Sequence, residues 1–306
     1  MQYNNYQDAA EGSAISFVPT PGQLQANQAH YKQPRASDPI GIFDSGAGGL
    51  TILSALRKEL PHESYIYIGD TANCPYGVRS DAEVIELTSR ACRFLIEKRA
   101  KLIVIACNTA SQAALAALRA SFDLSFIGVV PAVKPATRLT RKGKIGIIAT
   151  NQAASSTYLR QLIDEFAGGI QVYAEGCPGL VTLVEAGKLN GAEAAAEVKE
   201  AIRPLIAQGV DVLVLGCTHF PALRPVIQVQ AGPGVTIIDS GDAIARRTRS
   251  VLETENLTTP VTSQNASEGS LEVWCSGDAQ DFSRVASKVL GYDVIVKQAV
   301  EIPQMK

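Results

Sequence analysis

The chain has 306 residues, of which 46% are apolar, so it is long enough to form two domains of ordinary size. Its 28 Lys and Arg residues against 30 Asp and Glu residues give a net charge of −2, which excludes a broad electrostatic surface for nucleic acid or an anionic membrane. No segment approaches the roughly 18 apolar residues that span a bilayer, and the N-terminus lacks the features of a signal peptide. We therefore expect a cytoplasmic protein.

Residues 1–37 are rich in Gln, Asn, Ala, Ser and Pro and lack hydrophobic periodicity, which predicts a disordered N-terminal tail or a regulatory segment that orders on binding. Beyond this tail, strand-like and helix-like segments alternate. The predicted strands are residues 40–43, 65–68, 102–106, 126–129, 144–149, 171–173, 212–215, 235–238, 271–275 and 294–296. One predicted helix starts at about residue 50. The others cover residues 81–98, 112–121, 157–166, 192–208, 240–252 and 279–290. This alternation predicts an α/β fold with doubly wound parallel sheets.

The order of elements is doubled along the chain. Residues 131–135 interrupt the first series of strands and helices, and a fresh strand begins near Ile145. We predict two similar doubly wound parallel-sheet lobes that face each other across a cleft. The first lobe would comprise residues 38–133 and 241–300, and the second lobe residues 134–240.

Two cysteines sit in nearly identical settings, one in each predicted lobe. Cys107 and Cys217 each follow an apolar run and a small residue, and each precedes short polar side chains. A continuous apolar run is typical of a strand buried on both faces of a parallel sheet, and ligands bind at the carboxyl ends of such strands. The dipole of the following helix is expected to lower the thiol pKa from about 8.5. The two thiols could act as acid and base on opposite sides of one small molecule.

The remaining cysteines are expected to be reduced and mostly structural, since disulfides are rare in the cytoplasm. Cys92 lies in a predicted helix and Cys275 in a predicted strand, whereas Cys74 and Cys177 lie in loops near the predicted site. With three histidines and no C-x-x-C pair, the sequence predicts no metal site.

Two loops follow strands of the first lobe. Residues 44–49, Asp-Ser-Gly-Ala-Gly-Gly, could let the backbone approach an anionic ligand, or could form a tight turn in which Asp44 or Ser45 caps the next helix. A dinucleotide loop is not supported, because Thr51 stands where the third glycine would be. Residues 70–77 contain Pro-Tyr-Gly and predict a stiff loop that presents backbone N–H groups, or a structural turn.

Three further side chains are candidates for the cleft. His219 lies two residues after Cys217, so it could assist proton transfer or only cap the following turn. Asp44 could face Cys107 across the cleft, and Glu185 could line it.

Taken in order, several motifs resemble the cofactor-independent amino-acid racemase family, and glutamate racemase within it. The matching segments are residues 41–50, 69–71, 75–77, 106–111, Cys177-Pro178, 184–187, 215–221 and Ser276-Gly277-Asp278. They extend from about residue 39 to residue 296. One departure is Thr182, where the family commonly has proline, and the N-terminal tail is not a core feature of the family.

The resemblance implies a two-lobed enzyme that interconverts L- and D-glutamate without a cofactor, supplies D-glutamate for peptidoglycan synthesis and commonly forms a homodimer. By residue match, Cys107 would take the α-proton from the D-enantiomer with support from Asp44, and Cys217 from the L-enantiomer with support from His219. Substrate binding is implied for Asp44, Ser45, Tyr76, Gly77, Asn108, Thr109, Thr218 and His219, with Glu185 and Thr150 as supporting residues.

Three alternatives remain open. An aspartate-type racemase is disfavoured because such enzymes usually carry an acidic residue at the position of His219. A non-catalytic amino-acid-binding protein is disfavoured by the presence of both cysteines. A redox pair is disfavoured because thiols on opposite faces of a substrate stay apart. Activation by a cell-wall precursor, which occurs in some family members with longer N-termini, is raised but not established by residues 1–37.

Overall fold

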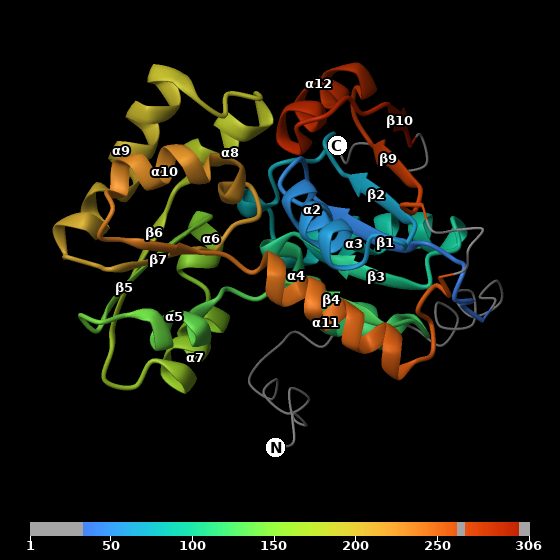
Figure 1. Cartoon of the computed structure of the whole chain (residues 1–306), viewed down its shortest axis with the longest axis horizontal. Coiled ribbons are helices and arrows are strands. Elements are labelled where there is room, and N and C mark those ends of the chain that lie inside the picture. The colour runs from blue at the N-terminus through green and yellow to red at the C-terminus, as the bar shows by residue number, and fades with distance from the viewer. Residues whose placement is uncertain (1–32, 262–266, 300–306) are drawn as a thin grey trace.

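The computed structural model describes residues 33–261 and 267–299, which form two parallel sheets in two lobes (Figure 1). In the first sheet the strands are ordered β10-β9-β2-β1-β3-β4, and in the second β6-β5-β7-β8. The first sheet contains β1 (Ile40–Asp44), β2 (Tyr65–Gly69), β3 (Leu102–Ile105), β4 (Phe126–Gly128), β9 (Leu271–Cys275) and β10 (Val296–Gln298). The second contains β5 (Lys144–Ala149), β6 (Gln171–Gly176), β7 (Val212–Leu215) and β8 (Thr236–Ile238). The predicted fold class is confirmed.

Helices cover both faces of each sheet, because the strands carry apolar side chains on both faces. One face of the first sheet packs on α2 (Leu50–Glu59), α11 (Gly241–Thr254) and α12 (Ala279–Leu290), and the other on α3 (Asp81–Glu97) and α4 (Asn108–Ser121). One face of the second sheet packs on α8 (Pro178–Glu185), α9 (Gly191–Ala207) and α10 (Arg224–Ala231), and the other on α5 (Val133–Leu139) and α7 (Thr157–Phe166). Short helices are η1 (Tyr76–Val78), α6 (Asn151–Ala154) and η2 (Phe220–Leu223).

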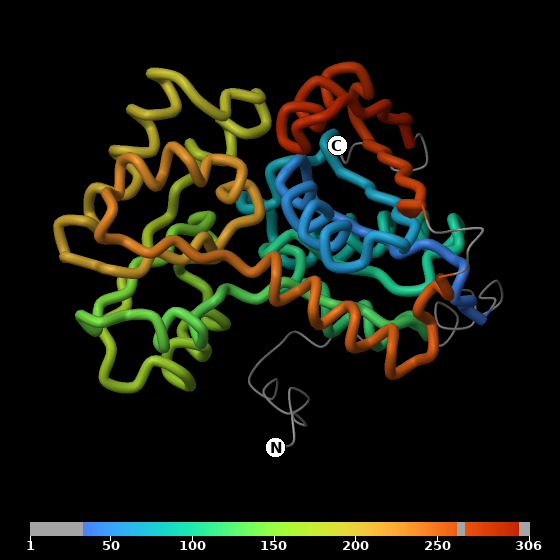
Figure 2. Tube along the Cα trace, viewed as in Figure 1, coloured from blue at the N-terminus to red at the C-terminus, as the bar shows by residue number. Residues whose placement is uncertain are grey.

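The chain passes from the first lobe to the second after β4 and returns after β8 (Figure 2). Ser240 Oγ donates a hydrogen bond of 2.5 Å to the carbonyl oxygen of Val130, so the two connections are tied together. The predicted division of the chain, with residues 38–133 and 241–300 in one lobe and residues 134–240 in the other, stays a prediction. None of the helices in the described ranges is long and apolar enough to cross a membrane.

Several elements differ from the sequence-based prediction. The helix expected at residues 112–121 begins at Asn108, because Cys107 itself serves as the N-cap. Residues 131–135 lie between β4 of the first sheet and β5 of the second, where the first series of strands and helices was expected to be interrupted, but they are partly helical. The helix α5 begins at Val133 and accommodates Pro135 in its first turn, where the N–H has no partner within the helix. The last strand lies at Val296–Gln298 rather than at residues 294–296, and α6, α8 and α10 were not predicted.

Residues 1–32 of the predicted tail lie outside the described residues. Residues 33–37 pack against the first lobe, because Lys101 Nζ donates a hydrogen bond of 2.6 Å to the carbonyl oxygen of Ala36. Lys101 also forms a buried ion pair with Glu63, with 2.5 Å between Nζ and Oε2. Thr259 completes this cluster by donating its backbone N–H to Glu63 Oε1 at 2.8 Å.

Candidate active site

The thiols of Cys107 and Cys217 line one small cavity between the two lobes. The free space inside is about 20 Å³, which is room for about one water molecule. Both lobes contribute to the wall, because the carboxyl ends of their strands meet at this cavity. The lining residues are Ser45, Cys74, Pro75, Tyr76, Gly77, Cys107, Asn108, Thr109, Thr150, Val181, Cys217, Thr218 and His219.

On the first-lobe side, Cys107 stands between β3 and α4. Its Sγ accepts a hydrogen bond from the backbone N–H of Ala110 at 3.5 Å and lies 3.5 Å from Ser45 Oγ. Burial raises the pKa of Cys107 to about 12, with a further increase from the charge of Asp44. These two effects outweigh the hydrogen bonds from the helix and from Ser45. The lowered pKa predicted for Cys107 is therefore wrong, because the thiol is buried beside a carboxylate.

Asp44 lies on the same sheet edge as Cys107, and not across the cleft as expected. It ends β1, which lies between β2 and β3 in the sheet, and β3 is the strand that precedes Cys107. Asp44 Oδ1 accepts a hydrogen bond of 2.9 Å from the N–H of Gly46, and Oδ2 accepts one of 3.0 Å from Thr218 Oγ1 in the second lobe. Burial raises the pKa of Asp44 to about 6, although the charge of His219 and these hydrogen bonds oppose the shift.

Two of the three glycines in residues 44–49 are explained by close approach of the second lobe. A Cβ atom on Gly46 would overlap the carboxylate of Glu185, and one on Gly48 would lie 2.5 Å from His219 Nδ1. Neither Asp44 nor Ser45 caps α2, whose N-cap is Gly49 without a side-chain hydrogen bond. Gly46 and Gly48 are therefore required because side chains from the other lobe contact the backbone there, whereas a Cβ atom on Gly49 would meet Asp44 Cβ of its own lobe at 2.6 Å.

On the second-lobe side, Cys217 is linked to a histidine–carboxylate pair. Cys217 Sγ lies 3.5 Å from His219 Nδ1, and His219 Nε2 lies 2.5 Å from Glu185 Oε1 at the end of α8. Burial alone would lower the pKa of His219, but the hydrogen bonds and charges of Cys217 and Glu185 raise it well above its ordinary value. His219 makes no side-chain cap to η2, so the capping interpretation is wrong.

Glu185 connects this pair to the first lobe. Its Oε1 also accepts a hydrogen bond of 2.7 Å from the backbone N–H of Ala47. Burial favours the neutral acid, but the contact with His219 and the N–H of Ala47 hold the pKa of Glu185 below its ordinary value. Glu185 and His219 therefore form an ion pair at neutral pH.

The other predicted substrate-binding residues also lie in the cavity wall. Asn108 Nδ2 donates a hydrogen bond of 2.5 Å to the carbonyl oxygen of Gly216, across the lobe interface. Thr109 Oγ1 lies 3.5 Å from Thr150 Oγ1, which caps α6. These contacts show that the polar wall is shared between the lobes.

A buried carboxylate holds the loop that carries Tyr76 and Gly77. The Tyr76 hydroxyl donates a hydrogen bond of 2.6 Å to Asp70 Oδ2, and Ser276 Oγ donates one of 2.5 Å to Asp70 Oδ1. The Ser276-Gly277-Asp278 segment thus supports the cavity from the C-terminal part of the first lobe, while Asp278 caps α12.

Sequence reasoning missed Val181 in the cavity wall and placed Cys74 only near the site. Val181 belongs to α8, a short apolar helix whose pattern gave no periodic signal. Thr182, the departure from the family pattern, is exposed and lies outside the wall. Cys177 is buried, and its thiol donates to the carbonyl oxygens of Glu175 and Ala201.

All six cysteines are free thiols. Among residues 33–261 and 267–299, no group of three or more His, Cys, Asp or Glu side chains is arranged to hold a metal ion.

Two facing lobes, each with a thiol at the edge of its sheet, are the arrangement expected of a cofactor-independent amino-acid racemase. The family model for Asp/Glu/hydantoin racemases matches residues 50–248, and the chain belongs to this family. A glutamate racemase from Herpetosiphon aurantiacus is 45% identical over 247 residues, which are 81% of this chain and 96% of that protein. The resemblance seen in the sequence motifs is confirmed.

Solved structures agree with this assignment. Glutamate racemase isoform RacE1 from Bacillus anthracis is 34% identical with a TM-score of 0.76, over 87% of this chain and 98% of that chain. The Escherichia coli glutamate racemase, solved in complex with L-glutamate and the activator UDP-MurNAc-Ala, is also 34% identical, with a TM-score of 0.75 over the same shares.

Proposed function

We propose that the protein interconverts L- and D-glutamate by moving the α-proton between two thiols, and so supplies D-glutamate for peptidoglycan synthesis. The observation that carries this proposal is that Cys107 and Cys217 come from different lobes and line one cavity. Inversion of a stereocentre requires a proton to leave one face and arrive at the other, which two opposed groups accomplish without crossing the substrate. The names of the relatives support glutamate as the substrate.

Each turnover moves one proton on each side of the substrate. In the L-to-D direction, the Cys217 thiolate takes the α-proton and leaves a carbanion, and the Cys107 thiol gives its proton to the opposite face. Cys217 ends as a thiol and Cys107 as a thiolate, so the enzyme is then set for the reverse direction. Nothing else is consumed, and the proposed reaction requires no cofactor.

The charges around the two thiols suit the L-to-D direction. With its pKa raised to about 12, Cys107 is a thiol at neutral pH, the form that donates a proton. The imidazolium of His219 lies beside Cys217 and attracts the negative charge of a thiolate. The α-proton is a weak acid, so donors on the α-carboxylate must stabilise the carbanion. The side chains of Ser45, Asn108 and Thr109 and nearby backbone N–H groups are the proposed donors.

Substrate entry requires the lobes to separate. The free space of about 20 Å³ holds about one water, and an amino acid is several times larger. Separation breaks the interlobe hydrogen bonds from Thr218 to Asp44 and from Asn108 to Gly216. Closure around glutamate then excludes water and brings both thiols to the α-carbon.

The test is an assay of the purified protein with each enantiomer of glutamate, under reducing conditions and without added cofactor. We expect racemisation of glutamate and its loss in both Cys107→Ala and Cys217→Ala. Full activity in either variant would overturn the two-base assignment. In deuterated water, early label should appear in the product and not in recovered substrate. Faster turnover of L-aspartate than of L-glutamate would favour an aspartate-type racemase instead.

The proposal also includes a homodimer in the cytoplasm and a lobe boundary near residues 133 and 241. The dimer rests on the resemblance to the family. Light scattering of the purified protein at several concentrations tests it, and a mass of one chain throughout would contradict it.

A further inference from the structure

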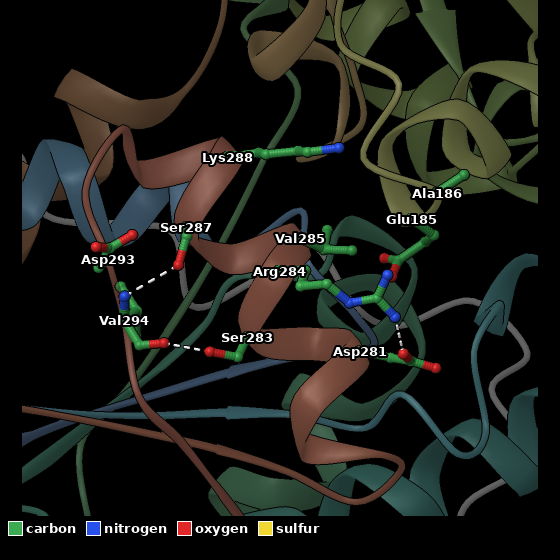
Figure 3. Close-up of a pocket in the computed structure, with 10 residues that line it drawn as sticks. All are labelled: Glu185, Ala186, Asp281, Ser283, Arg284, Val285, Ser287, Lys288, Asp293 and Val294. Atoms are coloured by element: carbon green, nitrogen blue, oxygen red, sulfur yellow. Dashed lines mark hydrogen bonds and ion pairs between the residues drawn. The ribbon is translucent and has the colours of Figure 1, made fainter.

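A second, larger groove lies next to the catalytic cavity, between α12 of the first lobe and the end of α8 in the second (Figure 3). Its volume is about 640 Å³. Glu185 lines this groove and also bonds His219, so it connects the groove with the cavity. The other lining residues are Ala186, Asp281, Ser283, Arg284, Val285, Ser287, Lys288, Asp293 and Val294.

Lys288 crosses this groove. Its side chain extends from α12 toward the second lobe (Figure 3), and Nζ donates a hydrogen bond of 3.1 Å to the carbonyl oxygen of Gly187. Asn108 and Thr218 make their interlobe bonds inside the cavity wall, whereas Lys288 makes its bond outside it. Lys288 therefore joins the closed lobes without contacting the space for the substrate.

The acceptor of this bond is fixed rigidly to Glu185. The helix α8 ends in a Schellman motif, in which the N–H of Lys188 bonds the carbonyl of Leu183 and the N–H of Gly187 bonds that of Val184, both at 2.8 Å. Gly187 takes a φ of +65°, which favours glycine. Because Glu185 is the last helical residue, a force on the Gly187 carbonyl moves Glu185 with it.

Charge and packing at this point both favour the contact. The ammonium of Lys288 lies at the C-terminal end of α8, where the helix dipole stabilises a cation. A Cβ atom on Gly187 would lie 3.1 Å from Lys288 Cδ and 3.2 Å from Nζ, so the lysine side chain packs against the glycine itself. Gly187 belongs to the motif of residues 184–187 but does not line the catalytic cavity. Its contact with Lys288 gives a structural reason for a glycine at this position.

We propose that Lys288 is a positioning residue, which holds the end of α8 so that Glu185 stays against His219 and Ala47 when the lobes are closed. This inference rests on the proposed function and concerns only the half of the reaction that uses Cys217. The hydrogen-bond contacts of Cys107 with Ser45 and Ala110 are made within the first lobe, whereas Cys217 is linked through His219 directly to Glu185 at the end of α8. Loss of Lys288 should therefore slow proton transfer at Cys217 more than transfer at Cys107, which Glu185 reaches only indirectly, through Ala47 in the loop that carries Ser45.

The readout must separate the two halves. The two enantiomers have equal free energies in water, so kcat/KM must be the same in both directions for every variant. The primary isotope effects measured with the two α-deuterated enantiomers do not have to be equal. A higher barrier at Cys217 makes removal of the L-proton more rate-limiting, and removal of the D-proton less so. A residue that only stabilises the fold would leave both isotope effects where they are.

The experiment compares the wild-type enzyme with Lys288→Met, using glutamate deuterated at the α-carbon in each enantiomer. We expect kcat to fall by about three- to tenfold in the variant, the size of effect of one partly exposed charged hydrogen bond. The primary isotope effect on kcat/KM should rise with L-glutamate and fall with D-glutamate. Lys288→Arg, which retains a charged donor, should restore most of the wild-type behaviour.

Lys297→Met is the matched control, because Lys297 pairs with Glu272 within the first lobe at 3.0 Å and does not cross the groove. It should leave kcat and both isotope effects unchanged. Gly187→Ala is a second variant, which strains the left-handed end of α8 and crowds Lys288 at the same time, and it should shift the isotope effects in the same directions as Lys288→Met does. Equal melting temperatures for Lys288→Met and the wild type exclude misfolding.

The inference is overturned if Lys288→Met keeps the isotope effects of the active wild-type enzyme, or if both effects change in the same direction. The reverse asymmetry would support the positioning role and overturn the assignment of the thiols to the enantiomers. A wild-type enzyme that does not racemise glutamate would overturn the proposed function itself, and is therefore a distinct result.

Discussion

Thr218 Oγ1 donates a hydrogen bond of 3.0 Å to Asp44 Oδ2 across the interface between the lobes. Thr218 directly follows Cys217, while Asp44 lies beside Cys107 on the edge of the other sheet. The carboxylate next to one thiol is therefore oriented by the neighbour of the other thiol. Closure of the lobes completes both halves of the site together, and neither lobe holds a finished half alone.

Replacement of Asp44 by Asn should have opposite effects on the reactivity of Cys107 and on turnover. The charge of Asp44 is the second cause, after burial, of the raised pKa of Cys107, so the pKa falls when that charge is removed. We expect alkylation of Cys107 by iodoacetamide at pH 8 to become several-fold faster, because the thiolate fraction grows tenfold with each unit of pKa. Racemisation should fall by about 10²- to 10³-fold, in the range of a lost acid–base group.

Peptide mass spectrometry measures alkylation at each cysteine separately. Cys177 serves as an internal reference, since its contacts are the carbonyls of Glu175 and Ala201 and not Asp44. Slower alkylation of Cys107 in Asp44→Asn, with Cys177 unchanged, would show that the carboxylate activates this thiol as a base.

The pair of His219 and Glu185 should make stability depend on pH. The pKa of His219 is raised in the folded protein, so its contribution is complete below the unfolded value near 6.5 and is lost as the pH rises through the folded pKa. The pKa of Glu185 is lowered, so its contribution is lost as the pH falls through that value. In His219→Gln the melting temperature should drop by a few degrees at pH 6, with a difference from the wild type that shrinks toward pH 10.

Thermal unfolding followed by circular dichroism across this pH range provides the measurement. His62→Gln is the control, because His62 contacts the carbonyl of Ser267 away from the site. A difference between His219→Gln and the wild type that grows with pH would contradict the ion pair.

The ion pair of Lys101 and Glu63 should dominate the stability of the N-terminal edge of the first lobe. Both side chains are buried, with 0% and 2% exposure. Lys101→Met leaves Glu63 as a buried charge without its cation, which should cost about 3–5 kcal/mol of unfolding free energy. Adding Glu63→Gln removes that charge and should recover about half of the loss. Denaturant titrations measure both variants, and a cost below about 1 kcal/mol for Lys101→Met would place this pair among the weak surface pairs.

Local patterns were sufficient to locate the two thiols. An apolar run before Cys107 and before Cys217 predicts the end of a buried strand, and parallel strands bring such ends to one edge. Contacts between residues far apart in the sequence could not be predicted in the same way. The position of Asp44 beside Cys107 depends on which strand neighbours β1, and the pairing of His219 with Glu185 depends on where α8 ends.

Quantities that depend on burial were also beyond local patterns. The helix dipole predicts a lower pKa for Cys107, but the thiol is only 6% exposed and lies near a carboxylate, so burial reverses the sign of the shift. Val181 was missed for a related reason, because an apolar residue in a short helix has the same pattern whether it faces a core or a cavity.

The order of the strands also has a consequence for synthesis of the chain. All four strands of the second sheet lie between Lys144 and Ile238, without interruption by the first. The first sheet is complete only after β9, which ends at Cys275, has paired with β2. On a ribosome, the lobe that carries Cys217 can fold while the lobe that carries Cys107 is still incomplete. The nascent enzyme therefore remains without a paired site until the segment that forms β9 has been translated.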